Sequence, residues 1–144
     1  MNTYLIKKTV ITILLFPILT IGNQNNSKIT DNENTVISIS EKWLIKIDKM
    51  DYDWCYNNAD KIIQERISIK EWNKTMNAVL DPFGEKISRN VNKVSFHTEL
   101  PGVPDGKYAI ITYNTSFKYK DKAIETISLV NIDNQWRVAG YFIR

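Results

Sequence analysis

The sequence of 144 residues contains a single cysteine and a single histidine, and these shortages exclude several kinds of site. Because Cys55 has no second cysteine to pair with, the chain cannot form an intramolecular disulfide. We expect Cys55 to be a small buried hydrophobic residue, and pairing between two chains is the alternative. His97 alone cannot build a histidine-based metal cluster. We expect it to be a surface residue rather than a general base, because its strand pattern turns it toward solvent.

The motifs of common enzyme classes are also missing. The sequence has no GxSxG, HExxH or CxxC motif and no phosphate-binding loop. Two glycines lie between Pro101 and Gly106, but no helix starts after them, so we interpret this segment as a turn. Asp51, Asp53 and Asp60 lack the glycine and the spacing of a calcium loop. We therefore assign no catalytic, cofactor-binding or metal-binding residue and expect no cofactor.

The first residues have the features of an export signal. Lys7 and Lys8 precede an uncharged apolar run over residues 9–21, which is shorter than the roughly 20 residues that span a bilayer. Small residues at Thr20 and Gly22 suit cleavage after Gly22. We predict a signal peptide and a periplasmic or secreted protein with no stable membrane span, and an uncleaved N-terminal membrane anchor is the alternative.

The predicted division of the chain follows from this signal. It consists of a signal peptide at 1–22, a polar, asparagine-rich and flexible lead-in at 23–34, and a single α+β domain at 35–144. Loss of two lysines with the signal lowers the formal net charge from +3 to about +1, since 17 basic residues then face 16 acidic ones. This balance gives no reason to expect binding to nucleic acid or strong attraction to a membrane surface.

The apolar spacing predicts three helices before the sheet. The first runs from about Val36 to Ile47, the second begins at Asp51 as N-cap, and the third opens with the capping-box pair Ser68 and Glu71. A turn at Asp81-Pro82-Phe83-Gly84 ends the third helix. The residues that we expect these helices to bury are Val36, Ile39, Trp43, Leu44, Ile47, Cys55, Ala59, Ile62, Ile63, Ile69, Trp72, Met76 and Val79.

Alternating residues predict four antiparallel strands after the helices. They begin near Arg89 and continue over 108–119, 123–131 and 136–144. The fold class is therefore α+β, with three N-terminal helices packed on a bent, cone-like four-stranded antiparallel sheet.

The register of the last hairpin follows from its alternation. Placing Asn131 opposite Trp136 sets Leu129 against Val138, Ile127 against Gly140 and Glu125 against Phe142. The predicted core face is then made up of Ile127, Leu129, Val138 and Phe142, and the predicted outer face of Ile124, Val130, Tyr141 and Ile143. For the preceding hairpin to share this core face, we expect a bulge or an odd-length loop near Lys118–Lys122.

Glu125 is the one charged residue in the predicted core row. A buried acid in a concave pocket can act as an acid or base. The interpretation that we favour is a structural ion pair with Arg144 or Arg89 at the end of the sheet. The aromatic residues Trp43, Trp54, Trp72, Trp136, Tyr113 and Phe117 can line a hydrophobic ligand site, but at this spacing we expect them to fill the core.

The chain resembles a family of bacterial exported proteins, domain of unknown function 4019. The resemblance covers nearly all of the domain, and its most specific parts are PGVPDGKY and WRVAGYFI. The matching residues are Trp43, 51–54, Trp72, Phe83-Gly84, Arg89, 100–108, Phe117, Glu125-Thr126 and 136–143. It implies export and a compact α+β domain, and it brings no catalytic residue. More loosely, helices followed by a bent sheet are similar to the nuclear transport factor 2-like cone, a likeness of architecture that does not set function.

Two functions remain open at this point. The favoured one is a non-enzymatic module that binds a protein partner, a second copy included, or a small apolar ligand. The alternative is a pocket enzyme of the isomerase or dehydratase kind that uses Glu125 as its acid–base group. A filled space between helices and sheet would argue against both an enzyme and a small-ligand site, leaving contact with a protein.

Overall fold

The computed structural model describes residues 30–144, so the predicted signal peptide and residues 23–29 of the predicted lead-in lie outside it. In this part of the chain, helices come first and strands follow. The helices are α1 (Asp31–Asp48), α2 (Tyr52–Asn57), α3 (Lys61–Gln64) and α4 (Ile69–Leu80). The strands are β1 (Lys86–His97), β2 (Lys107–Phe117), β3 (Lys120–Ile132) and β4 (Gln135–Ile143).

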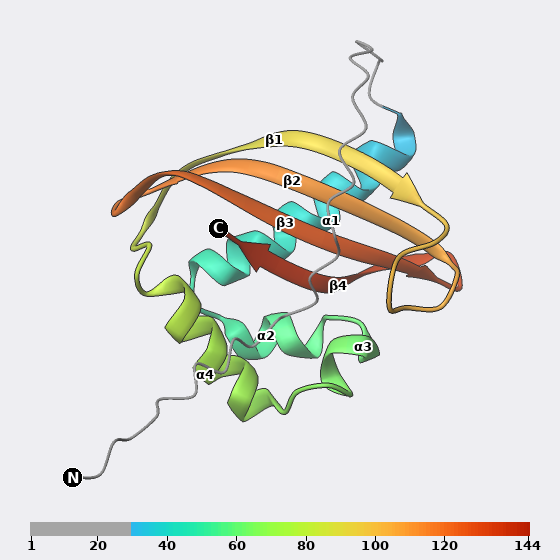
Figure 1. The fold of residues 1–144 in the computed structure, drawn as a ribbon, viewed down its shortest axis with the longest axis horizontal. Coiled ribbons are helices and arrows are strands. Elements are labelled where there is room, and N and C mark those ends of the chain that lie inside the picture. Colours follow the sequence, from blue (N-terminus) through green and yellow to red (C-terminus); the bar gives the residue numbers. More distant parts are fainter. Residues whose placement is uncertain (1–29) are drawn as a thin grey trace, which may run out of the picture.

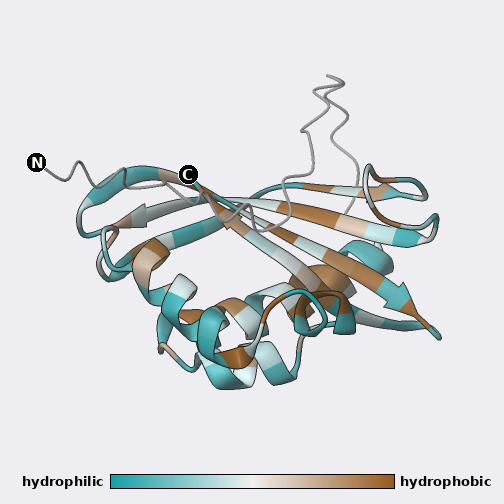
Figure 2. Cartoon of the chain, turned by 60° about the horizontal axis from the view of Figure 1, so that its bottom comes forward, coloured by the Kyte–Doolittle hydropathy of each residue, from teal (hydrophilic) through white to brown (hydrophobic). Residues whose placement is uncertain are grey.

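The four strands make one antiparallel sheet in the order β1-β2-β3-β4. The sheet is curved, and the helices lie together on one side of it (Figures 1 and 2). The predicted α+β class with a bent four-stranded antiparallel sheet is confirmed. The prediction of three helices is wrong, because the described residues form four.

The helix ends show how local sequence starts and stops each element. Ser68 and Glu71 make the predicted capping box of α4, and the helix ends at Leu80 as expected. An equivalent capping box joins Thr30 and Glu33, so α1 begins at Asp31. Residues 31–34 therefore belong to the helix and not to a flexible lead-in, which corrects that prediction.

The predicted second helix is interrupted after α2, which Asp51 caps as expected. The chain leaves the helix at Asn58, and Ala59 then forms a parallel bridge with Val138 of β4. The backbone N–H of Asp60 donates to the Val138 carbonyl over 2.7 Å. The side chain of Asp60 then caps α3. This contact with the sheet is non-local, and no periodicity within the helix sequence could indicate it.

Extra residues interrupt the regular pairing of three strands. In β3 the extra residue lies between Lys120 and Ala123, which confirms the irregularity predicted near Lys118–Lys122. As a result Ile111 lies opposite Ile127 on the core face. In β1 the extra residues are Ile87 and Asn92. Such bulges bend a strand and increase its twist, in keeping with the curved sheet.

A further bulge, at Ala139 of β4, corrects the predicted register. Leu129 lies opposite Val138 as expected, but Ser128 then pairs with Gly140, Ile127 with Tyr141 and Glu125 with Ile143. One extra residue exchanges the two faces for the rest of the strand. Tyr141 and Ile143 are therefore buried in the core, and Phe142 lies on the outer face opposite Thr126.

Large side chains fill the space between helices and sheet. Fully buried residues from both layers include Trp43, Trp72, Met76, Tyr113, Ile111, Ile127 and Leu129. The indole N–H groups of Trp43 and Trp72 donate to the backbone carbonyls of Cys55 and Tyr52, so both buried donors are satisfied. The expectation that these aromatic residues pack in the core is met for Trp43, Trp72, Tyr113 and Phe117, while Trp54 and Trp136 are half-buried against it.

A smaller cluster lies on the outer face of the sheet. Tyr108, Val130 and Ala139 are buried there beneath Leu100 and Val103 of the β1–β2 connection. The hydroxyl of Tyr108 donates to the carbonyl of Pro104 over 2.6 Å and so fastens this connection. Val130, which was predicted to lie open on the outer face, is therefore covered.

Candidate functional site

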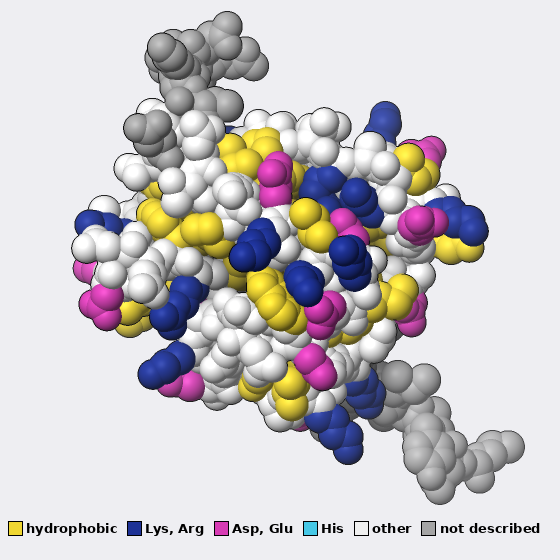
Figure 3. All heavy atoms as spheres, turned by 180° about the vertical axis from the view of Figure 1, so that it is seen from behind, with side chains coloured by type: hydrophobic (Ala, Val, Ile, Leu, Met, Phe, Trp, Pro, Cys, Tyr) yellow, Lys and Arg dark blue, Asp and Glu magenta, His cyan; other side chains and the backbone are white. Residues whose placement is uncertain are grey.

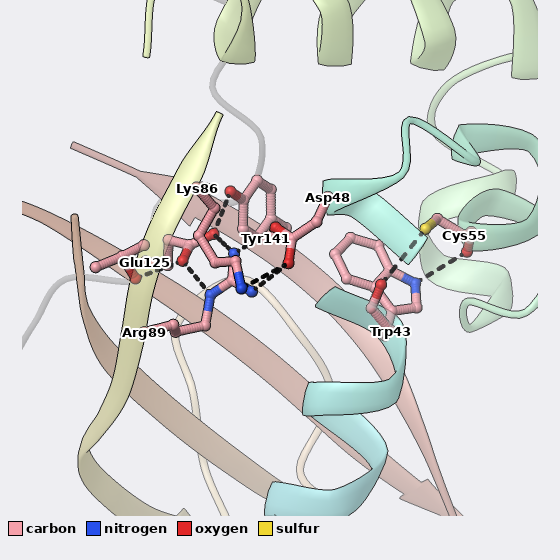
Figure 4. Close-up of polar contacts among 8 residues, drawn as sticks. Trp43, Asp48, Cys55, Lys86, Arg89, Glu125 and Tyr141 are labelled. Atoms are coloured by element: carbon pink, nitrogen blue, oxygen red, sulfur yellow. Dashed lines mark hydrogen bonds and ion pairs between the residues drawn. The ribbon is translucent and has the colours of Figure 1, made fainter. Parts of the chain in front are cut away.

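The buried carboxylate of Glu125 is the centre of the most strongly connected polar cluster in the described residues (Figure 4). Its Oε1 accepts hydrogen bonds from Tyr141 Oη at 2.8 Å and Arg89 Nη2 at 3.0 Å. Its Oε2 accepts from Thr115 Oγ1 at 2.5 Å and Arg89 Nε at 2.6 Å. The side chain is 0% exposed. Each carboxylate oxygen thus receives two hydrogen bonds, which satisfies the buried charge.

Arg89 joins this carboxylate to the helix layer. Its Nη1 and Nη2 each donate over 2.8 Å to one oxygen of Asp48, the last residue of α1. Lys86 lies 3.8 Å from the same carboxylate at the rim. The two acidic residues, Asp48 and Glu125, balance the two basic residues, Lys86 and Arg89, in formal charge. The arginine side chain is 9% exposed, and a guanidinium can make two bidentate pairs of this kind because its donors lie in one plane.

The electrostatic environment fixes the protonation states of the donors. Burial alone would lower the pKa of Arg89, but its hydrogen bonds to Asp48 and Glu125 outweigh burial and raise it. Burial raises the pKa of Tyr141 well above its ordinary value, and the neighbouring charge of Glu125 raises it further. Arg89 therefore stays charged and Tyr141 stays a neutral donor.

This geometry suits a structural role and does not suit acid–base chemistry. A general base must reach a substrate proton, whereas Glu125 is enclosed and already accepts four hydrogen bonds. The predicted ion pair with Arg89 is confirmed. Arg144, the other predicted partner, instead exchanges backbone hydrogen bonds with Ile124.

Cys55 lies in the core, as expected. It is fully buried, and burial raises the pKa of its thiol to about 12. Its Sγ donates to the carbonyl of Trp43, and the indole of Trp43 donates back to the carbonyl of Cys55 (Figure 4). The thiol is therefore protonated and shielded at neutral pH, which makes it a packing residue.

His97 and the three aspartates have local partners. His97 lies on the outer face, where its Nε2 is 3.0 Å from Ser95 Oγ. Asp51 and Asp60 cap α2 and α3, and a hydrogen bond from Lys46 lowers the pKa of Asp51. Asp53 accepts from Asn73 over 2.6 Å. Within residues 30–144, no cluster of three or more potential metal ligands is found.

A shallow polar depression of about 260 Å³ lies at the end of α1, away from the buried carboxylate. It is lined by Met50, Asp51, Tyr52, Asp53, Asn73 and Asn77. Asn73 Oδ1 is buried there without a hydrogen-bond partner. The depression lies outside the helix–sheet interior, so it is not the pocket that the sequence placed near Glu125.

Sequence reasoning found Glu125 and Arg89 but missed Asp48, Thr115 and Tyr141. Asp48 lies at the last turn of α1, where an acid gives no sign of its partner. Thr115 shares the core row with Tyr113 and Phe117, and strand alternation could have placed it beside Glu125. Tyr141 was placed on the wrong face because the bulge at Ala139 was not foreseen.

Comparison with known proteins now places this fold in a family. The profile of DUF4019, described as a protein of unknown function, matches residues 39–141. The chain belongs to this family. The matched region contains both Arg89 and Glu125, so the buried cluster lies within the family domain. No curated protein matches the chain in sequence.

A solved structure is similar in part. It is a Campylobacter jejuni protein named "Putative NTF2-like transpeptidase", with 13% sequence identity and a TM-score of 0.48, covering 76% of this chain and 97% of that chain. Among the residues that the structure describes, no helix has the length and apolar character needed to cross a membrane.

Proposed function

We propose that this DUF4019 chain is a non-enzymatic, exported binding module whose ligand is another protein. The observation that carries the proposal is the contrast between a filled interior and an outer sheet face whose described residues Ile110, Ile124 and Phe142 stay partly exposed beyond the covered end at Tyr108, Val130 and Ala139. Fully buried side chains of both layers occupy the space where a small apolar ligand or a substrate would bind. Export rests on the features of residues 1–22, which lie outside the described part of the chain.

The outer sheet face has the composition of an interface centre. On this face Ile110 of β2, Ile124 of β3 and Phe142 of β4 are half-buried, and their neighbours on the same face include Thr112 and Thr126. Neither β2 between Tyr108 and Ser116 nor β3 between Ile124 and Val130 places a charged side chain on this face. Centres of protein interfaces are likewise depleted of charge and enriched in aromatic residues.

The face of the molecule drawn in Figure 3 is of ordinary mixed character. Basic, acidic and hydrophobic side chains lie interspersed over the face seen in Figure 3. Such a face offers no continuous basic surface of the kind that nucleic-acid-binding proteins carry. This supports a protein as the ligand.

A second copy of the chain is the partner to which we commit. A two-fold dimer brings the same patch of both copies together, so the patch must be self-complementary. An uncharged patch with half-buried apolar residues meets this condition without repulsion between like charges.

Sedimentation velocity of the purified chain over a range of concentrations tests this proposal. We expect a dimer that Thr126→Lys converts to a monomer, because the new ammonium would be buried without a partner in the uncharged patch. Asn90→Lys adds the same charge to the outer face of β1 and serves as the matched control, with the dimer retained.

Native mass spectrometry of protein isolated from its own envelope reports the cleavage site and any bound molecule. A wild-type monomer at every concentration contradicts the dimer, and a stoichiometric small molecule contradicts the protein ligand.

A further inference from the structure

The two edges of the sheet differ in how they are closed. The edge of β4 is bridged by Ala59 and by the hydrogen bond from the Asp60 N–H to the Val138 carbonyl. β1 forms the other edge, along the top of the sheet in Figure 1, and within residues 30–144 no strand or bridge pairs with its outer side. An unpaired edge presents backbone donors and acceptors that can accept a further strand.

The C-terminal half of β1 has the regular geometry that strand addition needs. Beyond the bulge at Asn92, β1 pairs with β2 without interruption from Lys93 to His97. Val94 and Phe96 share the core-side row of this stretch, where they lie opposite Ile111 and Ala109. Val94 is half-buried, and Phe96 is 44% exposed. These half-open apolar side chains can contact alternate residues of an added strand.

The charge of β1 restricts what can pair with it. The strand carries Lys86, Arg89 and Lys93 and has no acidic residue. Lys86 and Arg89 are neutralised from inside by Asp48 and Glu125. Lys93 is exposed, and no ion pair involving it is found in the described residues. An edge lysine with nearby bulges discourages pairing with chains that lack a complementary charge.

We propose that the edge of β1 over Lys93–His97 binds an extended segment of a different protein, in which acidic and apolar residues alternate. An acidic residue of the added strand pairs with Lys93, and the apolar residues extend the row of Val94 and Phe96. A second copy of β1 is a poor occupant, because both strands would then bring only basic charge to the contact. Lys93 borders the outer sheet face, where it lies opposite Thr112. Strand addition uses the backbone edge of β1, whereas the proposed dimer uses the side chains of the outer face.

The test uses the full chain and three fluorescently labelled peptides. One alternates glutamate with valine, the second alternates lysine with valine, and the third is the acidic peptide with a central proline. We expect saturable binding of the acidic peptide alone, since lysine is repelled and proline removes a backbone donor. Amide hydrogen exchange should slow in β1 and remain unchanged in β4.

Charge-reversal variants test whether peptide binding depends on this edge or only on general attraction between charges. We expect Lys93→Glu to weaken binding of the acidic peptide about tenfold or more, as a favourable cross-strand pair becomes a repulsive one. Lys74→Glu, on the exposed surface of α4, is the matched control and should bind like the wild type. The proposal is overturned if the acidic peptide does not bind, if the proline peptide binds as well, or if both charge variants behave alike. The Thr126→Lys variant should retain peptide binding, so the proposed dimer and the proposed peptide site can be contradicted independently.

Discussion

Arg89 on β1 and Glu125 on β3 meet across the intervening strand β2, with Nε of the arginine 2.6 Å from Oε2 of the carboxylate. The same guanidinium holds Asp48 at the end of α1. Together with Thr115 and Tyr141, this cluster ties all four strands to the longest helix. Because burying charges has a large desolvation cost, such a network adds little net stability, but removing one of its members leaves a costly unpaired charge.

The first prediction concerns loss of one partner from this pair. Glu125→Gln should lower the free energy of unfolding by about 3–5 kcal/mol, because Arg89 keeps its charge and loses the buried negative charge of Glu125. Arg89→Met should cost a similar amount by leaving Glu125 uncompensated. Urea unfolding measures both variants.

The double variant Arg89→Met/Glu125→Leu provides the control for this prediction. It should cost clearly less than the sum of the two single changes, because no unpaired charge is left at Glu125. Simple additivity of the two costs would show that the residues do not act as a pair.

The second prediction concerns alkaline pH. Burial raises the pKa of both Cys55 and Tyr113 to about 12, from ordinary values of 9.0 and 10.0. The unfolded chain therefore ionises these groups first. Their contribution to stability is fully present below about pH 9 and is lost as the pH rises toward about 12.

Urea unfolding at a series of pH values above neutrality measures this loss. Cys55→Ala and Tyr113→Phe should each make the decline less steep, whereas Tyr119→Phe, which alters an exposed ring, should leave it unchanged. A stability that is flat over this pH range would contradict the protonated, buried state of both groups.

The third prediction concerns the turn between α4 and β1. Gly84 has φ +73°, and a Cβ placed there would lie 2.6 Å from Cδ2 of Tyr119 in the β2–β3 turn. Gly84→Ala should cost about 1–3 kcal/mol from the left-handed backbone, together with the displacement of the tyrosine ring.

Gly102 provides a matched control, because it has φ +80° and a Cβ added there would meet nothing within 4 Å. Gly102→Ala should therefore show the backbone cost alone. Thermal unfolding of both variants, and of Gly84→Ala combined with Tyr119→Ala, measures the steric part. If Tyr119→Ala does not reduce the cost of Gly84→Ala, the close packing is not its cause.

Local signals account for the parts of the fold that the sequence predicts. The capping pair Ser68 and Glu71 and the cap at Asp51 act within one helical turn, so they are visible in the sequence. The β2–β3 bulge was predictable because an unbulged pairing would have placed Thr112 and Asn114 in the apolar row. For the site, the odd charge of Glu125 indicated a buried ion pair and limited its partner to two arginines.

Non-local contacts account for the parts that were missed. The break after α2 follows from the contact of Asp60 with Val138, which lies in the last strand. Gly140, beside Ala139, is the one local sign of a bulge, because a glycine inside a strand often marks one. It does not show which residue is extra, and Val138-Ala139-Gly140 also fits an unbroken strand. The bulge has one clear consequence, which is that Tyr141 reaches Glu125 and donates to it.

The fourth prediction separates the two registers of β4. In the observed register the hydroxyl of Tyr141 donates to the buried Glu125 carboxylate over 2.8 Å, and Phe142 lies half-buried on the outer face. Tyr141→Phe should therefore lower the free energy of unfolding by about 1–3 kcal/mol, because the carboxylate loses one of its donors. Phe142→Tyr should be nearly neutral, since its new hydroxyl can reach solvent. Without the bulge, Phe142→Tyr would cost more than Tyr141→Phe, because Phe142 would then lie in the core and Tyr141 would be accessible. Urea unfolding of the two variants in parallel measures the difference, and a larger cost for Phe142→Tyr would contradict the bulge at Ala139.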